Sequence, residues 1–407
     1  MASNIDSAIV IDSFASVTGG ATRVAIDEAI GLAKRGISVT YFAAIGPIAR
    51  ELVDAGVSVL LLDEQALLSA NRNPGVVFQS LWNSRAYSRF DALLRNCSRR
   101  STVVHVHGFS QSMSASPIRC AIDRGFRVVS TLHDYFSACP NGGFFDYRVR
   151  TVCDRTPLSL SCVAHNCDKR GYSHKLFRVV RTIAQQRLGG LPESVRHFIT
   201  PSKSAADRLR PHLPPDAKYH LLPNPCAVLR APPVTVGNNS LVAVIGRLSP
   251  EKGIDELLVA ARRSETRLIF IGDGPLRTST ESSGMHTVTG WVSRERVFDM
   301  LSSVRCVVLP SLVPETYGLS VVDAAARGVP SIVTEICGVA ERIIHGQTGW
   351  RVPAGDLDAL TSCLSLLRSN EIVNSVGAAS YVEYWKSPLT VDAHISRLLD
   401  IYDSVLQ

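Results

Sequence analysis

The segment Pro314–Pro330, with the sequence PETYGLSVVDAAARGVP, joins a glycine turn to the start of a helix. Gly318 is the turn residue, and the small and apolar residues after it have helical spacing. Free N–H groups and the positive end of the helix dipole at such a junction attract an anion. The segment nevertheless carries two carboxylates, Glu315 and Asp323. They are either ordinary helix charges or hydrogen-bond acceptors for a ligand that has hydroxyl groups beside a phosphate.

Apolar runs typical of buried strands alternate with helical stretches on both sides of this segment. In chain order these runs are SAIVID, ISVTYFA, VSVLLLD, TVVHVHG, FRVVSTLHD, HFITPSK, LVAVIGRL, RLIFIGDG, HTVTGWV, CVVLPS and PSIVTE. Such alternation is typical of doubly wound parallel sheets, and it predicts an α/β fold class.

A proline-rich segment at residues 220–240, HLLPNPCAVLRAPPVTVGNNS, interrupts this alternation. Proline together with an Asn/Gly cluster is typical of a linker between domains. We therefore expect two Rossmann-like domains, residues 1–225 and 226–384, that face each other across a cleft. The tail, residues 385–407, has a helical pattern and is expected to cross back to the first domain.

The composition of the 407-residue chain, 45% hydrophobic and 19% charged, is that of a soluble globular protein. The net charge of +7 is uneven, because thirteen Lys and Arg face four Asp and Glu between Arg148 and Arg210. This surplus either attracts acidic substrates or an anionic membrane surface, or forms a solvated helical face. It lacks interleaved stacking aromatics, so we expect no nucleic-acid partner.

The sequence contains neither an apolar run of about eighteen residues nor an N-terminal signal-peptide pattern. Ten cysteines without an export signal indicate reduced thiols. These features predict a cytoplasmic protein, with peripheral contact at the cytoplasmic face of a membrane as a further expectation.

Four loops of the second half follow predicted strands, so they are expected at one edge of the sheet, where open α/β folds bind ligands. They contain the motifs GRLSPEKG, GDGP, GWV and PETYGL. The candidate ligand-binding residues in these loops are Arg247 and Lys252, Gly272 and Gly274, Trp291 and Val292, and Thr316, Gly318 and Leu319.

A nucleotide diphosphate-sugar would explain why both signs of charge meet at this edge. Arg247 as a donor fork and Lys252 as a point charge can neutralise its diphosphate. Backbone N–H groups at Gly318–Leu319 add further donors. Glu315 would accept hydrogen bonds from the sugar hydroxyls, and Asp323 from the ribose diol.

These motifs, in order with TGG, VVHVHG, GVAERI and GQTGWRVPAGD, resemble the retaining nucleotide-sugar glycosyltransferases of family 4, which have the two-domain GT-B fold. The resemblance covers essentially the whole chain. It implies a first domain for the acceptor and a second for a UDP- or GDP-linked donor, with Arg247 and Lys252 on the diphosphate and Glu315 on the sugar. The GWV segment would lie against the base.

The resemblance also implies front-face transfer to a glycan or lipid-linked acceptor in cell-surface polysaccharide biosynthesis. In this mechanism the departing phosphate acts as the base, and no cofactor or catalytic metal is required. The sequence departs from the family at one position: the family's acidic pair is two Glu, whereas the second acid here is Asp323, which is one methylene shorter. The pair Asp356 and Asp358 begins a helix and is predicted to cap it.

Candidate residues in the first domain lie in two motifs and at the end of one strand. Gly19 and Gly20 of TGG either let the backbone approach a phosphate or form a tight turn. In VVHVHG, the resemblance favours His107 as the active-site histidine and leaves His105 structural. His133 and Asp134 of TLHDYF either line the acceptor site or have a capping role.

Four cysteines lie within 29 residues in an irregular insertion at about residues 139–170, expected to be specific to the acceptor. They are Cys139, Cys153, Cys162 and Cys167. They either hold a structural zinc ion or are packing thiols, and their spacing does not match a compact CxxC…CxxC site.

Two further functions fit the same pattern. An epimerase on the same plan would convert the nucleotide-sugar without an acceptor. A non-catalytic nucleotide-sugar-binding subunit would bind the donor only, and the substitution at Asp323 is the feature that favours it.

Overall fold

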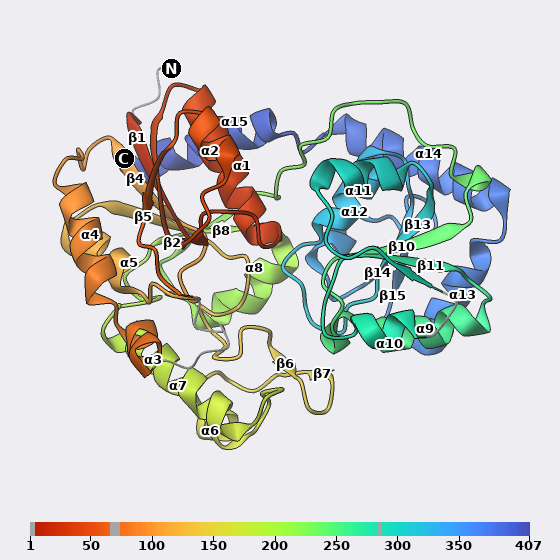
Figure 1. The fold of residues 1–407 in the computed structure, drawn as a ribbon, viewed down its shortest axis with the longest axis horizontal. Coiled ribbons are helices and arrows are strands. Elements are labelled where there is room, and N and C mark those ends of the chain that lie inside the picture. The colour runs from red at the N-terminus through yellow and green to blue at the C-terminus, as the bar shows by residue number, and fades with distance from the viewer. Residues whose placement is uncertain (1–4, 66–73, 283–285) are drawn as a thin grey trace.

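The computed structural model describes residues 5–65, 74–282 and 286–407 and contains two α/β domains side by side (Figure 1). Each domain is built on a parallel sheet. The predicted fold class is therefore confirmed.

The first domain has a seven-stranded sheet with the order β3-β2-β1-β4-β5-β8-β9. Its strands are β1 (Ser7–Phe14), β2 (Ser38–Ile45), β3 (Ser58–Leu61), β4 (Thr102–Val106), β5 (Arg127–Thr131), β8 (His197–Thr200) and β9 (Lys218–Leu221). Its helices are α1 (Gly20–Lys34), α2 (Arg50–Asp54), α3 (Pro74–Leu81), α4 (Ser84–Leu94), α5 (Ser116–Asp123), α6 (Leu160–Ala164), α7 (Tyr172–Arg187) and α8 (Lys203–Leu209), with a 3₁₀ turn at Arg210–His212.

Both faces of this sheet are buried. Along β1, Ile9 and Ile11 belong to one apolar core with α4 and α5, while Ala8 and Val10 belong to another with α1. Successive strand residues point to opposite faces, so a strand covered on both sides reads as a continuous apolar run.

The second domain has a six-stranded sheet with the order β12-β11-β10-β13-β14-β15. Its strands are β10 (Leu241–Ile245), β11 (Leu268–Ile271), β12 (Thr287–Val288), β13 (Val304–Leu309), β14 (Ser331–Thr334) and β15 (Trp350–Val352). Its helices are α9 (Ile254–Arg263), α10 (Arg277–Glu281), α11 (Arg294–Leu301), α12 (Leu319–Ala326), α13 (Leu357–Leu366) and α14 (Asn370–Lys386), with 3₁₀ turns at Val236–Asn238, Pro250–Lys252 and Gly338–Arg342. The Asp356 carboxylate accepts a hydrogen bond from Ala359 N–H at 2.9 Å, which confirms the predicted cap of α13.

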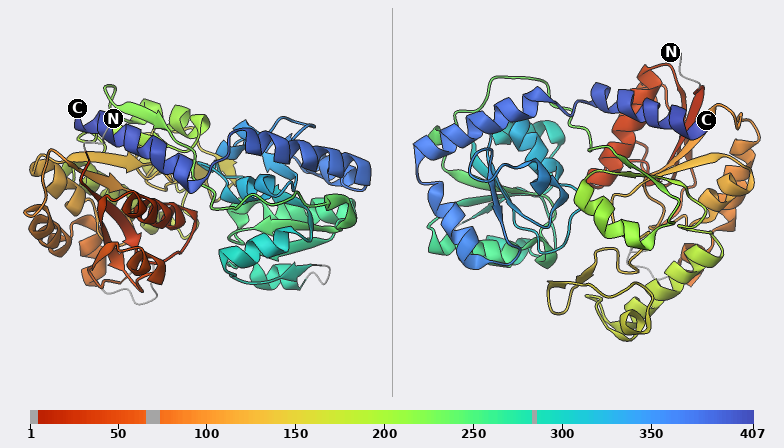
Figure 2. Two further views of the ribbon diagram at one scale, coloured as in Figure 1. Left: turned by 90° about the horizontal axis from the view of Figure 1, so that it is seen from above. Right: turned by 180° about the vertical axis from the view of Figure 1, so that it is seen from behind.

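The chain crosses between the domains twice. Residues 222–240 lead from β9 to β10, and the last helix, α15 (Val391–Leu406), lies on the first domain beside α1 (Figure 2). Ile395, Leu398 and Tyr402 of α15 are buried in the core shared with α1. A Cβ atom on Gly31 would lie 2.5 Å from Ile395 Cγ1, so the two helices approach closely because this position has no side chain.

The cysteine-containing insertion between β5 and α7 includes a short hairpin, β6 (Phe145–Asp146) and β7 (Thr151–Val152). Arg150 in this hairpin reaches the second domain, where it donates to Pro250 O at 3.0 Å and to the Asp255 carboxylate at 3.2 Å. The insertion thus contacts the loop that carries Lys252 in addition to lying on the first domain.

Candidate functional site

Lys252 and Glu315 form an ion pair at the carboxyl edge of the second sheet. Lys252 Nζ lies 2.8 Å from Glu315 Oε2. Burial alone would lower the pKa of Lys252, but the Glu315 carboxylate raises it, so the ammonium group stays charged. The other oxygen, Glu315 Oε1, is buried and has no hydrogen-bond partner among the described residues. A buried carboxylate oxygen without a donor is costly, so this atom is suited to accept a hydrogen bond from a ligand.

Glycines hold the loops of this edge against one another. A Cβ atom on Gly253 would lie 2.0 Å from Pro310 O, one on Gly272 2.0 Å from Gly246 O, and one on Gly274 2.2 Å from Leu248 O. Gly272 and Gly274 therefore pack against the loop of Arg247. The Arg247 side chain itself is exposed, and the structure records no hydrogen bond or ion pair for it within the described chain.

Candidate residues of the two domains meet at this edge. Thr316 Oγ1 donates to His133 O of the first domain at 2.8 Å, and Ser202 Oγ donates to Thr316 O at 2.8 Å. A Cβ atom on Gly20 would lie 3.2 Å from Leu319 Cδ1. The glycine loop of the first domain thus faces the Gly318–Leu319 start of α12, where the anion site was predicted.

The segment predicted to contact a base lies beside the Gly272 loop. Gly290 forms an isolated bridge with Gly272, and Trp291, which follows it, is 64% exposed. Val292 packs at the margin of the second-domain core. Trp291 is therefore free to stack on a planar ligand.

Asp323 has partners that the sequence did not indicate. Its Oδ1 atom lies 3.4 Å from Arg294 Nη2 and accepts from Cys226 Sγ at 3.1 Å. Arg294 also lies 3.2 Å from Asp27 Oδ2, on α1 of the first domain. Asp27 is in turn paired with Arg23. A ribose at Asp323 would have to share this carboxylate with Arg294 or displace it.

Arg294 allows a test of how strongly this network couples the two domains. We expect Arg294→Met to lower the free energy of unfolding by ~2 kcal/mol, because the largely buried Asp323 carboxylate loses its cation and Asp27 keeps only Arg23. The double variant Arg294→Met/Asp323→Asn should lose less than the sum of the single losses, as measured by denaturant unfolding. Strict additivity would contradict the pairing.

A buried cluster of one carboxylate and three imidazoles lies beneath the candidate site in the first domain. Glu28 Oε2 lies 3.2 Å from both His105 Nδ1 and His107 Nε2, and Glu28 Oε1 lies 2.8 Å from His394 Nε2 on α15. His394 also contacts Pro223 O of the linker at 3.0 Å. His107, the predicted active-site histidine, is thereby linked to the segment that joins the domains.

The neighbouring groups in this cluster shift the pKa values of Glu28 and His105. Burial alone would raise the pKa of Glu28, but the imidazoles of His107 and His105 hold it well below its usual value. Burial and the neighbouring His107 lower the pKa of His105 to about 4. Glu28 is therefore ionised while His105 is neutral.

Glu28, His105 and His107 are also a group of described residues whose ligand atoms, all within 4.8 Å of one another, are close enough to hold one metal ion. Both ring nitrogens of His105 are already engaged, with Tyr402 and with Thr131 at 2.7 Å each. Hydrogen bonding alone thus accounts for the position of His105, as expected for a structural histidine.

The residues at the end of β5 lie against this cluster. His133 Nε2 lies 2.9 Å from His107 Nδ1, so His133 extends the chain of imidazoles toward the second domain. The Asp134 carboxylate accepts from Phe136 N–H at 2.9 Å, which is the local turn-capping geometry considered from the sequence.

Three of the four cysteines of the insertion lie near the ammonium group of Lys175. Lys175 Nζ lies 3.3 Å from Cys162 Sγ. Burial alone would lower the pKa of Lys175, but the thiols of Cys167, Cys162 and Cys139 raise it. Among the described residues, these cysteines form no group placed to hold a metal ion. A zinc ion at Cys139, Cys153, Cys162 and Cys167 therefore stays a prediction for elemental analysis.

Solved structures with this arrangement of two domains are glycosyltransferases of the GT-B fold. Sucrose-phosphate synthase from Thermosynechococcus elongatus superposes with a TM-score of 0.71 and 18% identity, covering 98% of this chain and 99% of that one. Anabaena HepE in complex with UDP and glucose superposes with a TM-score of 0.69 and 15% identity, covering 98% and 99%. The chain therefore has the two-domain GT-B fold.

Family models identify the chain more closely. The model "Glycosyltransferase Family 4" matches residues 18–228, and "Glycosyl transferases group 1" matches residues 229–379. The chain belongs to glycosyltransferase family 4, as the sequence motifs predicted.

Curated relatives match over part of their length. The sulfoquinovosyl transferase SQD2 of Arabidopsis thaliana is 32% identical over 151 residues, 35% of this chain and 29% of that protein. The O-antigen chain mannosyltransferase C of Escherichia coli is 29% identical over 182 residues, 42% and 48% of the two chains. The matched stretches thus span less than half of each of these two relatives.

Proposed function

We propose that the protein transfers a sugar from a nucleotide diphosphate-sugar to a glycan or lipid-linked acceptor in polysaccharide biosynthesis. The observation that carries this proposal is the Lys252–Glu315 pair, in which Glu315 Oε1 is buried without a donor among the described residues. Arg247, on the same loop as Lys252, has an exposed side chain. One end of this site can bind a hydroxyl group and the other end an anion. The structurally similar HepE forms a complex with UDP and glucose, which supports a UDP-linked donor here.

In the proposed reaction the acceptor hydroxyl attacks the anomeric carbon on the face from which the nucleotide diphosphate leaves. The departing phosphate oxygen takes the proton of the acceptor, so retention needs no protein nucleophile. Arg247, Lys252 and the backbone N–H groups at the start of α12 stabilise the negative charge that develops on the leaving group. The mechanism requires no metal ion on the diphosphate.

The remaining residues position the two substrates. Glu315 holds hydroxyl groups of the donor sugar, and His107 lies on the acceptor side, where its ring or backbone would contact the same sugar. Contacts such as Thr316 with His133 join the domains around the reacting groups and would keep water out, which protects the donor from hydrolysis.

The donor is identified by thermal shift with a panel of UDP-glucose, UDP-galactose, UDP-N-acetylglucosamine and GDP-mannose. A donor that binds the folded state at a hundred times its Kd stabilises the protein by about 2.7 kcal/mol. We expect one nucleotide class to raise the melting temperature and to release free nucleotide diphosphate when an acceptor extract is added.

Other outcomes of this experiment point to the alternatives. Interconversion of the sugar with donor alone would identify an epimerase. Donor binding with neither transfer nor slow hydrolysis would identify a binding subunit. If no donor of the panel stabilises the protein, the proposed function is wrong.

A further inference from the structure

Helix α7 (Tyr172–Arg187) buries its polar face and exposes its apolar face, which is the reverse of the usual arrangement. The helix buries Lys175, Arg181, Thr182 and Gln185 together with a single apolar residue, Val179. Its exposed face carries four large apolar side chains, Tyr172, Leu176, Val180 and Ile183, which are 39–51% exposed. These four residues follow the spacing of one helix face and define an apolar stripe.

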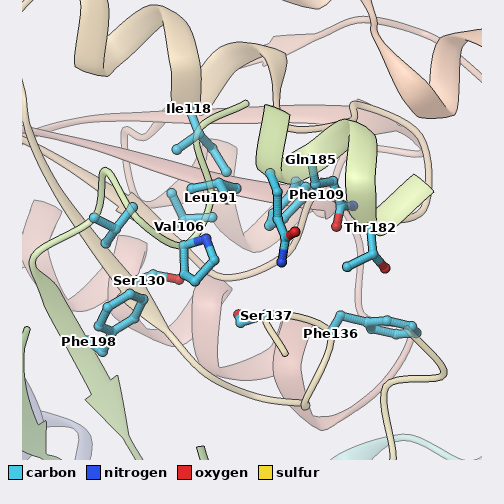
Figure 3. A pocket seen from close by; sticks show the side chains of 13 residues that line it. Val106, Phe109, Ile118, Ser130, Phe136, Ser137, Thr182, Gln185, Leu191 and Phe198 are labelled. Carbon is cyan, nitrogen blue, oxygen red and sulfur yellow. The ribbon is translucent and has the colours of Figure 1, made fainter. Parts of the chain in front are cut away.

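The buried face of α7 is fixed by specific contacts, so the helix cannot simply rotate to hide the stripe. Lys175 Nζ contacts Cys162 Sγ, Arg178 pairs with Asp168 at 2.7 Å, and Arg181 donates to Ser110 O at 3.2 Å. Figure 3 shows Thr182 and Gln185 lining a pocket together with Phe136 and Phe198. These contacts set which way α7 faces.

Two helices that pack against α7 carry further exposed apolar side chains. Helices α3 and α6 pack beside α7 at the end of the first domain that is lowest in Figure 1. Phe78 of α3 is 71% exposed, and Leu160 of α6 is 90% exposed. Exposed apolar side chains gathered on adjoining elements are typical of a surface that contacts lipid or another protein.

The charge of this region indicates whether the apolar surface contacts lipid or another protein. Helix α7 contains no acidic residue, and Arg187 lies in line with the stripe at its last turn. Between residues 148 and 187 the exposed charged side chains are one acid and five bases, namely Asp154, Arg148, Arg155, Lys169, Arg170 and Arg187. Of these bases, Lys169 pairs with Glu251 of the second domain and Arg170 lies 4.0 Å from Asp168. An apolar helix face that ends in an arginine, in a segment with a surplus of exposed bases, complements an anionic lipid surface.

We propose that the outer face of α7, together with Phe78 and Leu160, docks the protein on the surface of an anionic phospholipid bilayer. In the described ranges 5–65, 74–282 and 286–407, no helix is long and apolar enough to cross a bilayer, so the contact is interfacial. This placement brings the first domain to the membrane. Only the purpose of the contact, which is access to a lipid-linked acceptor, rests on the proposed function.

Vesicle co-sedimentation of the full chain tests this surface. We expect binding to vesicles of phosphatidylcholine with one quarter phosphatidylglycerol, and at least tenfold weaker binding to phosphatidylcholine alone. Leu176→Glu/Val180→Glu should reduce binding to the anionic vesicles at least tenfold. The matched control is Val259→Glu on α9, a 44% exposed valine of the second domain, which should bind like the unchanged protein.

Further measurements separate the alternatives. If the unchanged protein does not bind anionic vesicles, or if the double variant binds as well as the control, the docking face is disproved. A dimer that the double variant dissociates in analytical ultracentrifugation would instead identify a surface between two copies. Stabilisation by nucleotide-sugar should be the same in all variants, so loss of vesicle binding is distinguishable from failure of the proposed function.

Discussion

Glu315→Gln is expected to lower the rate of sugar transfer by a factor of roughly a hundred or more, and Lys252→Ala by a similar factor. The amide keeps the size of Glu315 but removes the charge that holds Lys252 at 2.8 Å, and it offers a sugar hydroxyl a weaker acceptor. The alanine removes a cation from the leaving group. Release of nucleotide diphosphate in steady-state kinetics measures both effects.

A second ion pair of the same type provides the control. Lys386 and Glu383 lie 2.6 Å apart on the exposed surface of α14, away from the candidate site. Lys386→Ala should leave the rate within about twofold, since exposed pairs contribute little. If Lys252→Ala and Glu315→Gln are equally harmless while circular dichroism shows intact folds, the assignment of this pair to the reaction is wrong.

Gly253→Ala is expected to destabilise the second domain by roughly 3 kcal/mol and to abolish donor binding. Gly253 has φ +70°, and its added Cβ would lie 2.0 Å from Pro310 O, a backbone atom that cannot move without shifting β13. The displaced segment is the one that carries Lys252. Chemical denaturation and thermal shift with the donor measure the two effects.

Gly346→Ala is the control that separates the effect of the steric clash at Gly253 from the effect of a positive φ angle. Gly346 has φ +75°, nearly the same conformation, but nothing lies within 4 Å of its Cβ position. This variant should lose about 1 kcal/mol and bind the donor normally. Equal losses in the two variants would show that packing against Pro310 is not important.

The fold could be predicted from the sequence because its strands are buried on both faces. Continuous apolar runs such as that of β1 identify such strands without any knowledge of their neighbours. The loops after β10, β11 and β13 could be placed at one edge for the same reason, because parallel strands all end there. The helix cap at Asp356 could also be predicted, because its contact with Ala359 spans only three residues of the chain.

The contacts that the sequence did not reveal join residues far apart in the chain. Arg294 and Asp27 are 267 positions apart, and His394 and Glu28 are 366 apart. No periodic pattern encodes such pairs. One signal was present: Asp27 and Glu28 are adjacent acids inside a helix whose neighbours are mainly apolar, and both are buried. Two buried carboxylates in an apolar helix require partners, although the sequence alone does not name them.

The position of α15 constrains the order in which the molecule can be completed during synthesis. Ile395, Leu398 and Tyr402 fill the core of the first domain, yet the ribosome makes them after the entire second domain. Domains generally fold as they emerge, starting from the N-terminus. The nascent first domain therefore lacks part of its apolar core along α1 until α15 has been synthesised.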